Sequence, residues 1–329
     1  MEYLHIKTLY IEVTHACNQH CKHCYLDGGI HNNVAEMSTE QIKKILKEFK
    51  KQDGRYIILT GGEPIMRSDI FEILDYIETL EIPFSFASNS LAMSQQRLEM
   101  LASYKYLDMY FTSILGVDAE KHKSIAEKDS YDKILHAISF FEKKEILTYV
   151  QVTLANDFID DIEDIAEKLM QFQNCTVKFT PIGTMGIKSE EDVKENNSLL
   201  VPKCNFEAFH SRVSILQKKY PDRIEDCNIQ NQEQIFNIIS DYKDEKLYAM
   251  CYGFIAVRAN GDISFSCNMD NPYTFRKAYE SIRIPIDEKL MNYIDLLRRA
   301  EAATLKEAES SIVEFDVTVD KYIRQFSEE

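Results

Sequence analysis

The first two thirds of the chain alternate short apolar runs with longer stretches of helical periodicity, and this alternation strongly constrains the fold. Six such units can be counted, each beginning with a run typical of a buried strand. Alternating strands and helices predict an α/β fold, a parallel sheet with helices packed outside it. Six units favour a partial, TIM-like (β/α)6 barrel over a closed barrel. The expected strands lie near residues 8–13, 56–60, 83–87, 107–112, 147–153 and 176–180.

The stretches between the expected strands carry apolar residues at the spacing of a helix face. The helix expected from about residue 39 has Ser38 as its N-cap and Gln41 three residues later, a pattern typical of a capping box. We interpret its apolar stripe as a core face rather than a cofactor site. The same spacing recurs near residues 70–77, 134–141, 162–169 and 206–216.

The alternating pattern ends near residue 220, so we expect two domains. Residues 1–219 would form the partial barrel, and residues 220–329 a smaller α+β C-terminal extension. In the extension, apolar alternation on both sides of Asn260-Gly261 predicts a β-hairpin with a type I′ turn. The tail from about residue 286 has the pattern of amphipathic helices.

The charge and the apolar runs exclude several classes of partner. A formal net charge of -16 opposes binding to nucleic acid, which requires neutralisation of phosphates by basic side chains. No window approaches the roughly 18 apolar residues that span a bilayer, and no signal peptide is recognisable. We therefore expect a soluble, cytoplasmic protein with no membrane partner. Its 8 cysteines then favour metal ligation or thiol chemistry over disulfides.

Three cysteines follow the first expected strand with the spacing CxxxCxxC, namely Cys17, Cys21 and Cys24. Three thiolates complete neither a structural zinc site nor an ordinary four-iron cluster, because both take four ligands. A four-iron cluster on these cysteines would have one iron without a protein ligand, which could bind a small molecule. The alternative is a zinc site completed by one of the neighbouring histidines, His15, His20 or His23.

Polar and glycine-rich motifs follow the expected strands at their C-terminal ends, where ligands gather in this class of fold. After the second strand stand Gly61, Gly62, Glu63 and Pro64. Two glycines let a backbone approach a ligand closely, a carboxylate can offset an ammonium charge, and a proline fixes the turn. The ends of the later strands carry Ser88, Asn89, Ser113, Asn156, Pro181 and Gly183.

The cysteine spacing, with the aromatic Tyr25 directly after it, resembles the signature of the radical S-adenosylmethionine (radical SAM) superfamily. The glycine-rich motif likewise matches the GGEP motif of that family. The resemblance implies a 4Fe–4S cluster on the three cysteines, with S-adenosylmethionine (SAM) chelating the remaining iron. The residues that it assigns to SAM binding are Tyr25, Gly61, Gly62, Glu63, Pro64, Ser88, Asn89, Ser113 and Asn156.

Three positions depart from the family pattern. Ser90 stands where a glycine is frequent, and Leu115 stands where an acidic residue is usual. The arginine that often binds the SAM carboxylate has no clear match, which leaves Lys123 or Lys128 as a substitute.

The resemblance also implies the reaction. An electron donor such as flavodoxin or ferredoxin would supply the electron that splits SAM into methionine and a 5′-deoxyadenosyl radical. The radical would then take a hydrogen atom from a substrate, while the protein positions the substrate and excludes water.

Two cysteines, Cys251 and Cys267, bracket the expected hairpin and resemble the opening of a SPASM or twitch extension. Such extensions hold auxiliary iron–sulfur clusters, and here Cys204 and Cys227 would have to complete a second 4Fe–4S site from upstream. The alternatives are buried apolar cysteines, or a free thiol that returns a hydrogen atom to a substrate radical. We interpret Cys175, beside a strand start, as structural.

The SPASM-like hairpin favours a ribosomally synthesised precursor peptide as substrate, with epimerisation or cross-linking as the outcome. About six residues precede the first strand, so we expect no small N-terminal peptide-recognition domain. A radical SAM dehydrogenase or biosynthetic enzyme acting on a small molecule is the alternative. An anaerobic sulfatase-maturing enzyme would need more cysteines, and from a different class the chain could be a non-catalytic zinc-binding scaffold.

Overall fold

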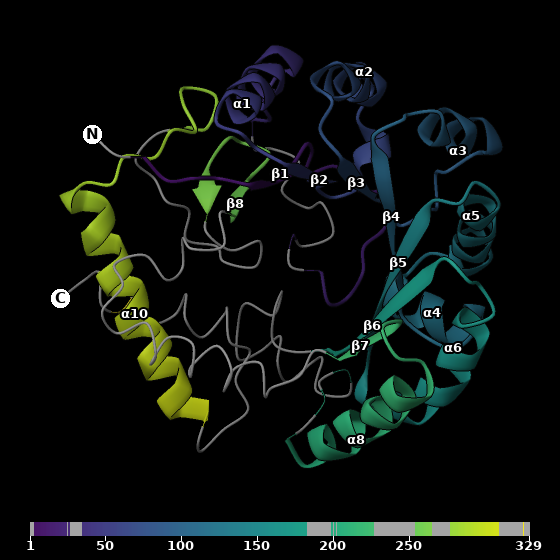
Figure 1. Cartoon of the computed structure of the whole chain (residues 1–329). Helices are drawn as coiled ribbons and strands as arrows, with labels where there is room; N and C mark the ends of the chain where they lie inside the picture. The colour runs from purple at the N-terminus through teal and green to yellow at the C-terminus, as the bar shows by residue number, and fades with distance from the viewer. Residues whose placement is uncertain are drawn as a thin grey trace.

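A curved, mostly parallel β-sheet forms the centre of the fold (Figure 1). The computed structural model describes residues 3–24, 26, 35–182, 199, 201, 203–226, 254–264, 277–308 and 325. Within them the strand order is β7-β6-β5-β4-β3-β2-β1-β8-β9, and every neighbouring pair is parallel except β8 with β9. The strands are β1 (Thr8–Glu12), β2 (Tyr56–Thr60), β3 (Phe84–Ala87), β4 (Leu107–Ile114), β5 (Leu147–Leu154), β6 (Cys175–Pro181), β7 (Ile224–Asp226), β8 (Phe254–Val257) and β9 (Ile263–Ser264).

The sheet is open, with β7 and β9 at its opposite edges in the described residues. All six strands expected from the sequence are present, so the prediction of an α/β partial barrel is confirmed. The 3₁₀ helices η2 (Pro64–Met66) and η3 (Asn156–Asp161) follow β2 and β5. The α-helices are α1 (Thr39–Lys51), α2 (Ile70–Leu80), α3 (Gln95–Ala102), α4 (Ala119–Ala126), α5 (Tyr131–Lys143), α6 (Ile162–Leu169), α8 (Lys203–Lys219) and α10 (Glu288–Ala308).

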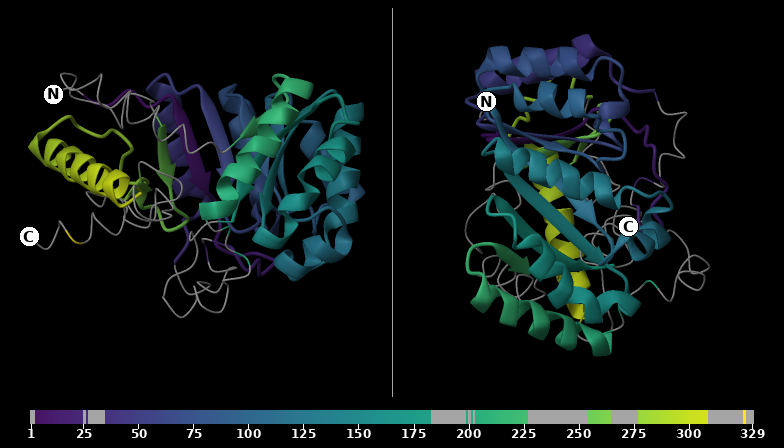
Figure 2. Two further views of the ribbon diagram at one scale, coloured as in Figure 1. Left: turned by 90° about the horizontal axis from the view of Figure 1, so that it is seen from below. Right: turned by 90° about the vertical axis from the view of Figure 1, so that its right-hand side faces the viewer.

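Helices α1 to α6 and α8 cover the convex face of the sheet, whereas α10 lies beyond the β8–β9 side (Figures 1 and 2). The capping box predicted at the start of α1 is present. The Ser38 hydroxyl accepts from the Gln41 backbone N–H at 3.2 Å, and the Gln41 side chain accepts from the Ser38 N–H at 2.8 Å. None of the described helices is long and apolar enough to span a bilayer.

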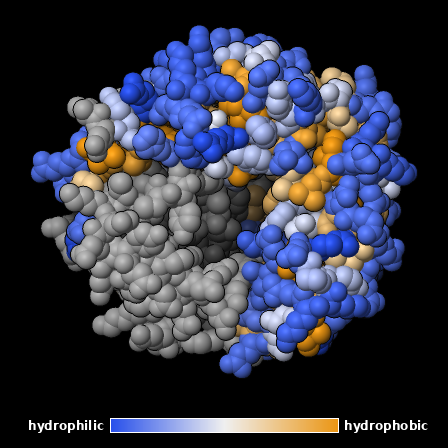
Figure 3. Space-filling view, in the orientation of Figure 1, coloured by the Kyte–Doolittle hydropathy of each residue, from blue (hydrophilic) through white to orange (hydrophobic). Residues whose placement is uncertain are grey.

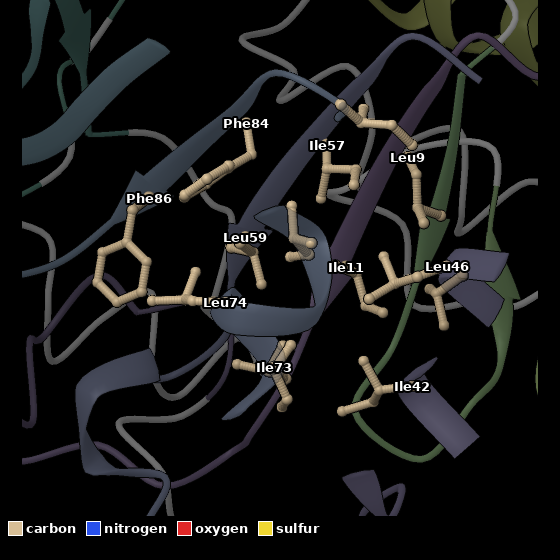
Figure 4. Close-up of a cluster of buried hydrophobic side chains, with 14 of the residues drawn as sticks. Leu9, Ile11, Ile42, Leu46, Ile57, Leu59, Ile73, Leu74, Phe84 and Phe86 are labelled. Atoms are coloured by element: carbon tan, nitrogen blue, oxygen red, sulfur yellow. The ribbon is translucent and has the colours of Figure 1, made fainter. Parts of the chain in front are cut away.

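The core lies between the helices and the convex face. Ile42 and Leu46 of α1 pack against Leu9 and Ile11 of β1, and α2 packs over β2 and β3 in the same way (Figure 4). Burial of these apolar side chains stabilises the fold by about 25 cal/mol per Å² of apolar surface removed from water. The apolar stripes read from the sequence are therefore core faces.

The concave face has a different character, because successive side chains of a strand point to opposite sides. In β5, Val150 and Val152 are buried against the helices, whereas Tyr149 and Gln151 are half-buried on the other side. The Tyr149 ring stacks on Phe111 of β4 at 5.2 Å between centroids. Figure 3 shows this view of the molecule hollowed near its centre and mostly hydrophilic around the periphery.

The hairpin predicted in the C-terminal third is present, but the prediction of a type I′ turn was wrong. Strands β8 and β9 pair antiparallel through Val257 and Ile263. The Arg258 N–H donates to the Asp262 carbonyl at 2.8 Å and so closes the loop. The Gly261 N–H donates to the Arg258 carbonyl, also at 2.8 Å. Gly261 has φ +86° but Asn260 is not among the positive-φ residues, as in a three-residue loop ending in a left-handed glycine.

The hairpin belongs to the same sheet as the N-terminal strands, since β8 pairs in parallel with β1. Where these two strands end, Arg258 Nη1 lies 2.5 Å from Oε1 of the fully buried Glu12. The sheet therefore extends across the expected boundary at 219/220, and the division into two domains stays a prediction.

We predict that Ile45→Ala lowers the free energy of unfolding by about 2–5 kcal/mol. Ile45 is a fully buried residue of α1, and the truncation of its side chain creates a cavity. Ile215→Ala is the matched control, since Ile215 is also helical but 61% exposed, and should change the free energy by less than about 0.5 kcal/mol. Urea denaturation measures both, and equal effects would contradict the assignment of the core.

Candidate functional site

The loop that carries the three cysteines follows β1 at the C-terminal edge of the sheet, and main-chain hydrogen bonds hold it on two sides. The Gly62 N–H donates to the Thr14 carbonyl, and the Glu63 N–H donates to the Ala16 carbonyl, each at 2.8 Å. Further along, the Lys22 N–H donates to the carbonyl of Ile125 in α4 at 3.0 Å. The loop after β2 and the end of α4 therefore fix the cysteine loop between them.

The two glycines after β2 are required by this close approach. A Cβ on Gly62 would lie 2.5 Å from the carbonyl oxygens of His15 and Ala16, and one on Gly61 would lie 2.3 Å from the Thr14 carbonyl oxygen. Gly61 also has φ +146°, which side chains rarely adopt. The sequence predicted that the glycines let the backbone approach a ligand, whereas here they let it approach the cysteine loop.

Two residues that the sequence analysis missed anchor the entrance to the cysteine loop. Arg67 Nη1 donates to the Val13 carbonyl at 2.7 Å and to the Met37 carbonyl at 2.9 Å, while its Nε pairs with Asp69 at 2.7 Å. Glu36 Oε1 accepts from the Thr14 hydroxyl and from the His15 N–H. Both residues lie outside the motifs that the sequence analysis singled out, and the backbone groups that they bind are distant in the sequence, as Val13 is from Arg67.

Glu63 is fully buried and joins the loops after β2 and β3. Its Oε2 accepts from the Asn89 N–H at 2.6 Å, and its Oε1 accepts from the Ile65 N–H at 3.3 Å. Burial raises the pKa of Glu63 to about 7, and the bonds from Asn89 and Ile65 oppose that rise. Both carboxylate oxygens of Glu63 therefore accept hydrogen bonds from backbone N–H groups of this site.

The loop after β3 also contacts the cysteine loop. The Asn89 side-chain amide donates to Asn18 Oδ1 at 2.8 Å and lies 3.7 Å from Cys17 Sγ. Ser90, at the position where the family often has glycine, adopts φ +64°. Its hydroxyl bonds to the Tyr110 hydroxyl at 2.7 Å, and this fully buried contact holds a serine in a conformation that favours glycine.

The ends of β4, β5 and β6 meet beside Cys21 in a small apolar cluster that includes Leu115, Ala155 and Ile182. Ser113 is half-buried near the end of β4. Asn156 begins η3, and its Oδ1 accepts from Asn205 of α8 at 2.7 Å. The other predicted rim residues are placed as follows: Ser88 is buried, Pro64 opens η2, Pro181 ends β6, and Lys123 and Lys128 are exposed.

The three thiols lie within electrostatic range of one another. Burial raises the pKa of Cys17, and the charges of Glu63 and Cys24 add to that rise. Burial also raises the pKa of Cys21 to about 12, with Cys24 and Cys17 contributing. Three neighbouring thiolates would repel one another unless a cation held them, so this donor set fits an iron–sulfur cluster or another soft metal.

Among the described residues, no group of three or more His, Cys, Asp or Glu side chains is placed so that it could hold a metal ion. His15, His20 and His23 are thus not assembled with the cysteines into a zinc site in that part of the chain, and burial lowers the pKa of His23 to about 4. The support for an iron–sulfur cluster therefore comes from the three cysteine thiols as a set of ligands, not from the present placement of their side chains.

Several predicted residues cannot be placed. Tyr25, Gly183, Cys227, Cys251 and Cys267 lie outside the described residues, and only the backbone of Cys204 is described, in α8. Their assignment to SAM, to an auxiliary cluster or to hydrogen-atom donation stays a prediction. Cys175 is buried at the start of β6, where a structural role was expected.

Comparison with known proteins finds similarity mainly in the first half of the chain. The sequence model described as the Radical SAM superfamily matches residues 11–169. The chain is 27% identical to mycofactocin maturase MftC of Mycolicibacterium smegmatis over 176 residues, which are 53% of this chain and 44% of that protein. It is 26% identical to an AdoMet-dependent heme synthase of Oleidesulfovibrio alaskensis over 155 residues, 47% of this chain and 40% of that protein. The matches span less than half the length of either relative.

The fold is similar to that of SuiB from Streptococcus suis. The crystal structure of SuiB bound to S-adenosylmethionine matches with a TM-score of 0.69 over 92% of this chain and 70% of SuiB, at 15% identity. SuiB bound to the precursor peptide SuiA matches with a TM-score of 0.65 over 88% of this chain and 65% of SuiB. At this level of identity the likeness shows a shared fold.

We predict that Gly62→Ala displaces the cysteine loop, because its methyl group would lie too close to two backbone carbonyls. Overpacking of this kind costs about 1–3 kcal/mol. Alkylation of Cys17, Cys21 and Cys24 in the metal-free chain, followed by mass spectrometry, should become faster. Gly54→Ala is the control, since its methyl group would overlap the Phe49 ring just before β2, at the opposite end of that strand from the cysteine loop, and it should leave these rates unchanged. Unchanged rates in Gly62→Ala would contradict the coupling of the two loops.

Proposed function

We propose that the chain is a radical SAM enzyme, because residues 11–169 match the sequence model of the Radical SAM superfamily. Cys17, Cys21 and Cys24 would hold a 4Fe–4S cluster whose fourth iron binds SAM. The observation that carries the proposal is the direct hydrogen bonding between the loop of Gly62 and the cysteine loop. Two motifs that the family uses for one cofactor and one cosubstrate thereby meet at the same edge of the sheet.

The residues around the cysteines would bind and orient SAM. When bound, the cluster supplies the electron that splits SAM into methionine and a 5′-deoxyadenosyl radical. Gly61, Gly62, Glu63 and Pro64 would present the loop after β2 to the amino group of SAM. The other proposed contacts are Ser88, Asn89, Ser113, Asn156 and Tyr25.

The reaction needs a reductant and protection from oxygen. A flavodoxin or ferredoxin would deliver the electron, and the reducing cytoplasm is the location that we propose. Residues 1–219 would carry the chemistry, and residues 220–329 would cover the substrate as a SPASM-like or twitch-like extension.

We infer that the substrate is a ribosomally made peptide. The name of MftC as a maturase and the precursor peptide bound by SuiB support this class of substrate. The concave face also offers a suitable surface, because Ser113, Gln151 and Lys178 are in register across β4, β5 and β6 and are all half-buried. Such a polar row beside the Phe111–Tyr149 pair suits an extended chain with both polar groups and apolar side chains.

A small-molecule substrate is the second candidate, favoured by the similarity to an AdoMet-dependent heme synthase. Anaerobic incubation of the reconstituted chain with SAM, dithionite and a candidate precursor peptide separates the two. A mass shift of the peptide, or deuterium uptake from D₂O, supports a peptide substrate with cross-linking, oxidation or epimerisation as the outcome. A peptide that stays unchanged while SAM is cleaved would contradict it.

We predict that Cys24→Ala abolishes both cluster assembly and SAM cleavage, because two thiolates retain a four-iron cluster poorly. Iron and sulfide analysis and quantification of 5′-deoxyadenosine measure the two effects. Cys175→Ala is the control, since Cys175 is buried in β6, and should keep normal iron content. Full activity of Cys24→Ala would overturn the site, and zinc in place of iron in the anaerobic protein would favour a zinc-binding scaffold.

The iron count also tests the C-terminal cysteines. About eight irons per reconstituted chain would support a second 4Fe–4S cluster on Cys204, Cys227, Cys251 and Cys267, and about four would support a single cluster. If they are ligands, Cys251→Ala and Cys267→Ala should each lower the count from eight towards four. If the count stays unchanged, a role as hydrogen-atom donor to the substrate radical remains for them.

A further inference from the structure

A chain of buried polar side chains leads from the cysteine loop to the end of β4. Gln19, between Cys17 and Cys21 in the sequence, is 4% exposed, and its Nε2 lies 2.7 Å from the Ser130 hydroxyl. The same hydroxyl lies 2.9 Å from Nε2 of His122, and both Ser130 and His122 are 1% exposed. At the far end, Nδ1 of His122 accepts from the Leu115 N–H at 3.2 Å.

The direction of the hydrogen bonds can be worked out from the histidine. Because the Leu115 N–H donates to Nδ1, that nitrogen carries no proton, and the neutral ring must carry its proton on Nε2. Burial lowers the pKa of His122 to about 4, which keeps the ring neutral. His122 Nε2 therefore donates to the Ser130 hydroxyl, which retains its own proton to donate.

Ser130 has one suitable acceptor for that proton in this chain of contacts, the side-chain amide of Gln19. Its hydroxyl makes no capping bond with α5, although Ser130 is the N-cap of that helix. If the amide oxygen of Gln19 faces Ser130, the hydroxyl donates to it and every group in the chain is satisfied. The amide nitrogen then takes the position that lies 3.6 Å from Cys21 Sγ.

Cluster binding would require this orientation. In the structure the Cys21 thiol faces two acceptors, Gln19 Oε1 at 3.6 Å and the Ala126 carbonyl at 4.0 Å. A thiolate that ligates iron has lost its proton and can only accept. The Ala126 carbonyl is fixed in the backbone, but the Gln19 amide can turn and present its N–H groups.

We propose that, when Cys21 ligates the cluster, Gln19 donates an N–H···S bond to its thiolate, oriented by Ser130 and His122. Gln19 is thus a positioning residue that also tunes the cluster, because hydrogen bonds to cluster sulfurs stabilise the more negative, reduced state. The proposal rests on the proposed function, since it requires a cluster on the three cysteines. It adds a hydrogen-bond chain that ties the properties of the cluster to the end of β4.

The test is the midpoint potential of the reconstituted full-length chain, measured by redox titration with EPR detection. Gln19→Met keeps the length of the side chain but removes both bonds, so the potential should shift to more negative values. Ser130→Ala leaves the amide in place without its orienting partner and should shift the potential in the same direction by less. Ser124→Ala is the control and should leave the potential unchanged. Ser124 is exposed on α4, and the hydrogen bond described for its hydroxyl goes to the Lys121 carbonyl.

A second readout reports the bond itself. ENDOR spectra of the reduced protein should show an exchangeable proton coupled to the cluster that is absent from Gln19→Met. A potential and a proton coupling that are the same in wild type and Gln19→Met, at equal iron content, would overturn the proposal. If Gln19→Met fails to hold iron, Ser130→Ala decides, since it changes no residue of the cysteine loop. Wild-type protein without a cluster would instead refute the proposed function.

Discussion

The hydrogen bonds between the loop after β2 and the cysteine loop are the contact on which the rest of the site depends. Two backbone N–H groups, of Gly62 and Glu63, bond to the carbonyls of Thr14 and Ala16. The contact is possible only because position 62 has no side chain. From it the Glu63 carboxylate reaches the loop after β3, and Asn89 of that loop reaches back to Asn18. Hydrogen bonds thereby join three consecutive strand ends into one rim.

The convex face of the sheet contributes to stability, whereas the concave face carries the polar groups that a substrate could contact. The convex face buries its side chains under helices, as Val150 and Val152 do, and this burial stabilises the strands that carry the loops. The concave face keeps polar and aromatic groups half-buried, with Tyr149 and Gln151 on the same strand. A substrate that enters the concave side would therefore meet hydrogen-bonding groups on a scaffold that is rigid from behind.

The sequence predicts the fold and the motifs well, because both rest on local patterns. Strand and helix positions follow from periodicity, and the Ser38 capping box was read correctly. The contacts that hold the site together were missed because they join distant residues, such as Gln19 with Ser130 or Arg67 with Val13. The turn type at Asn260-Gly261 was wrong because the number of loop residues, which pairing of β8 with β9 determines, selects the turn.

A cysteine loop held in this way would support a 4Fe–4S cluster with one iron open to SAM. EPR of the dithionite-reduced, reconstituted chain with and without SAM tests it most directly, because a new ligand changes the g values of the cluster. We expect a 4Fe–4S signal that shifts when SAM is added. A cluster signal that is identical with and without saturating SAM would contradict it.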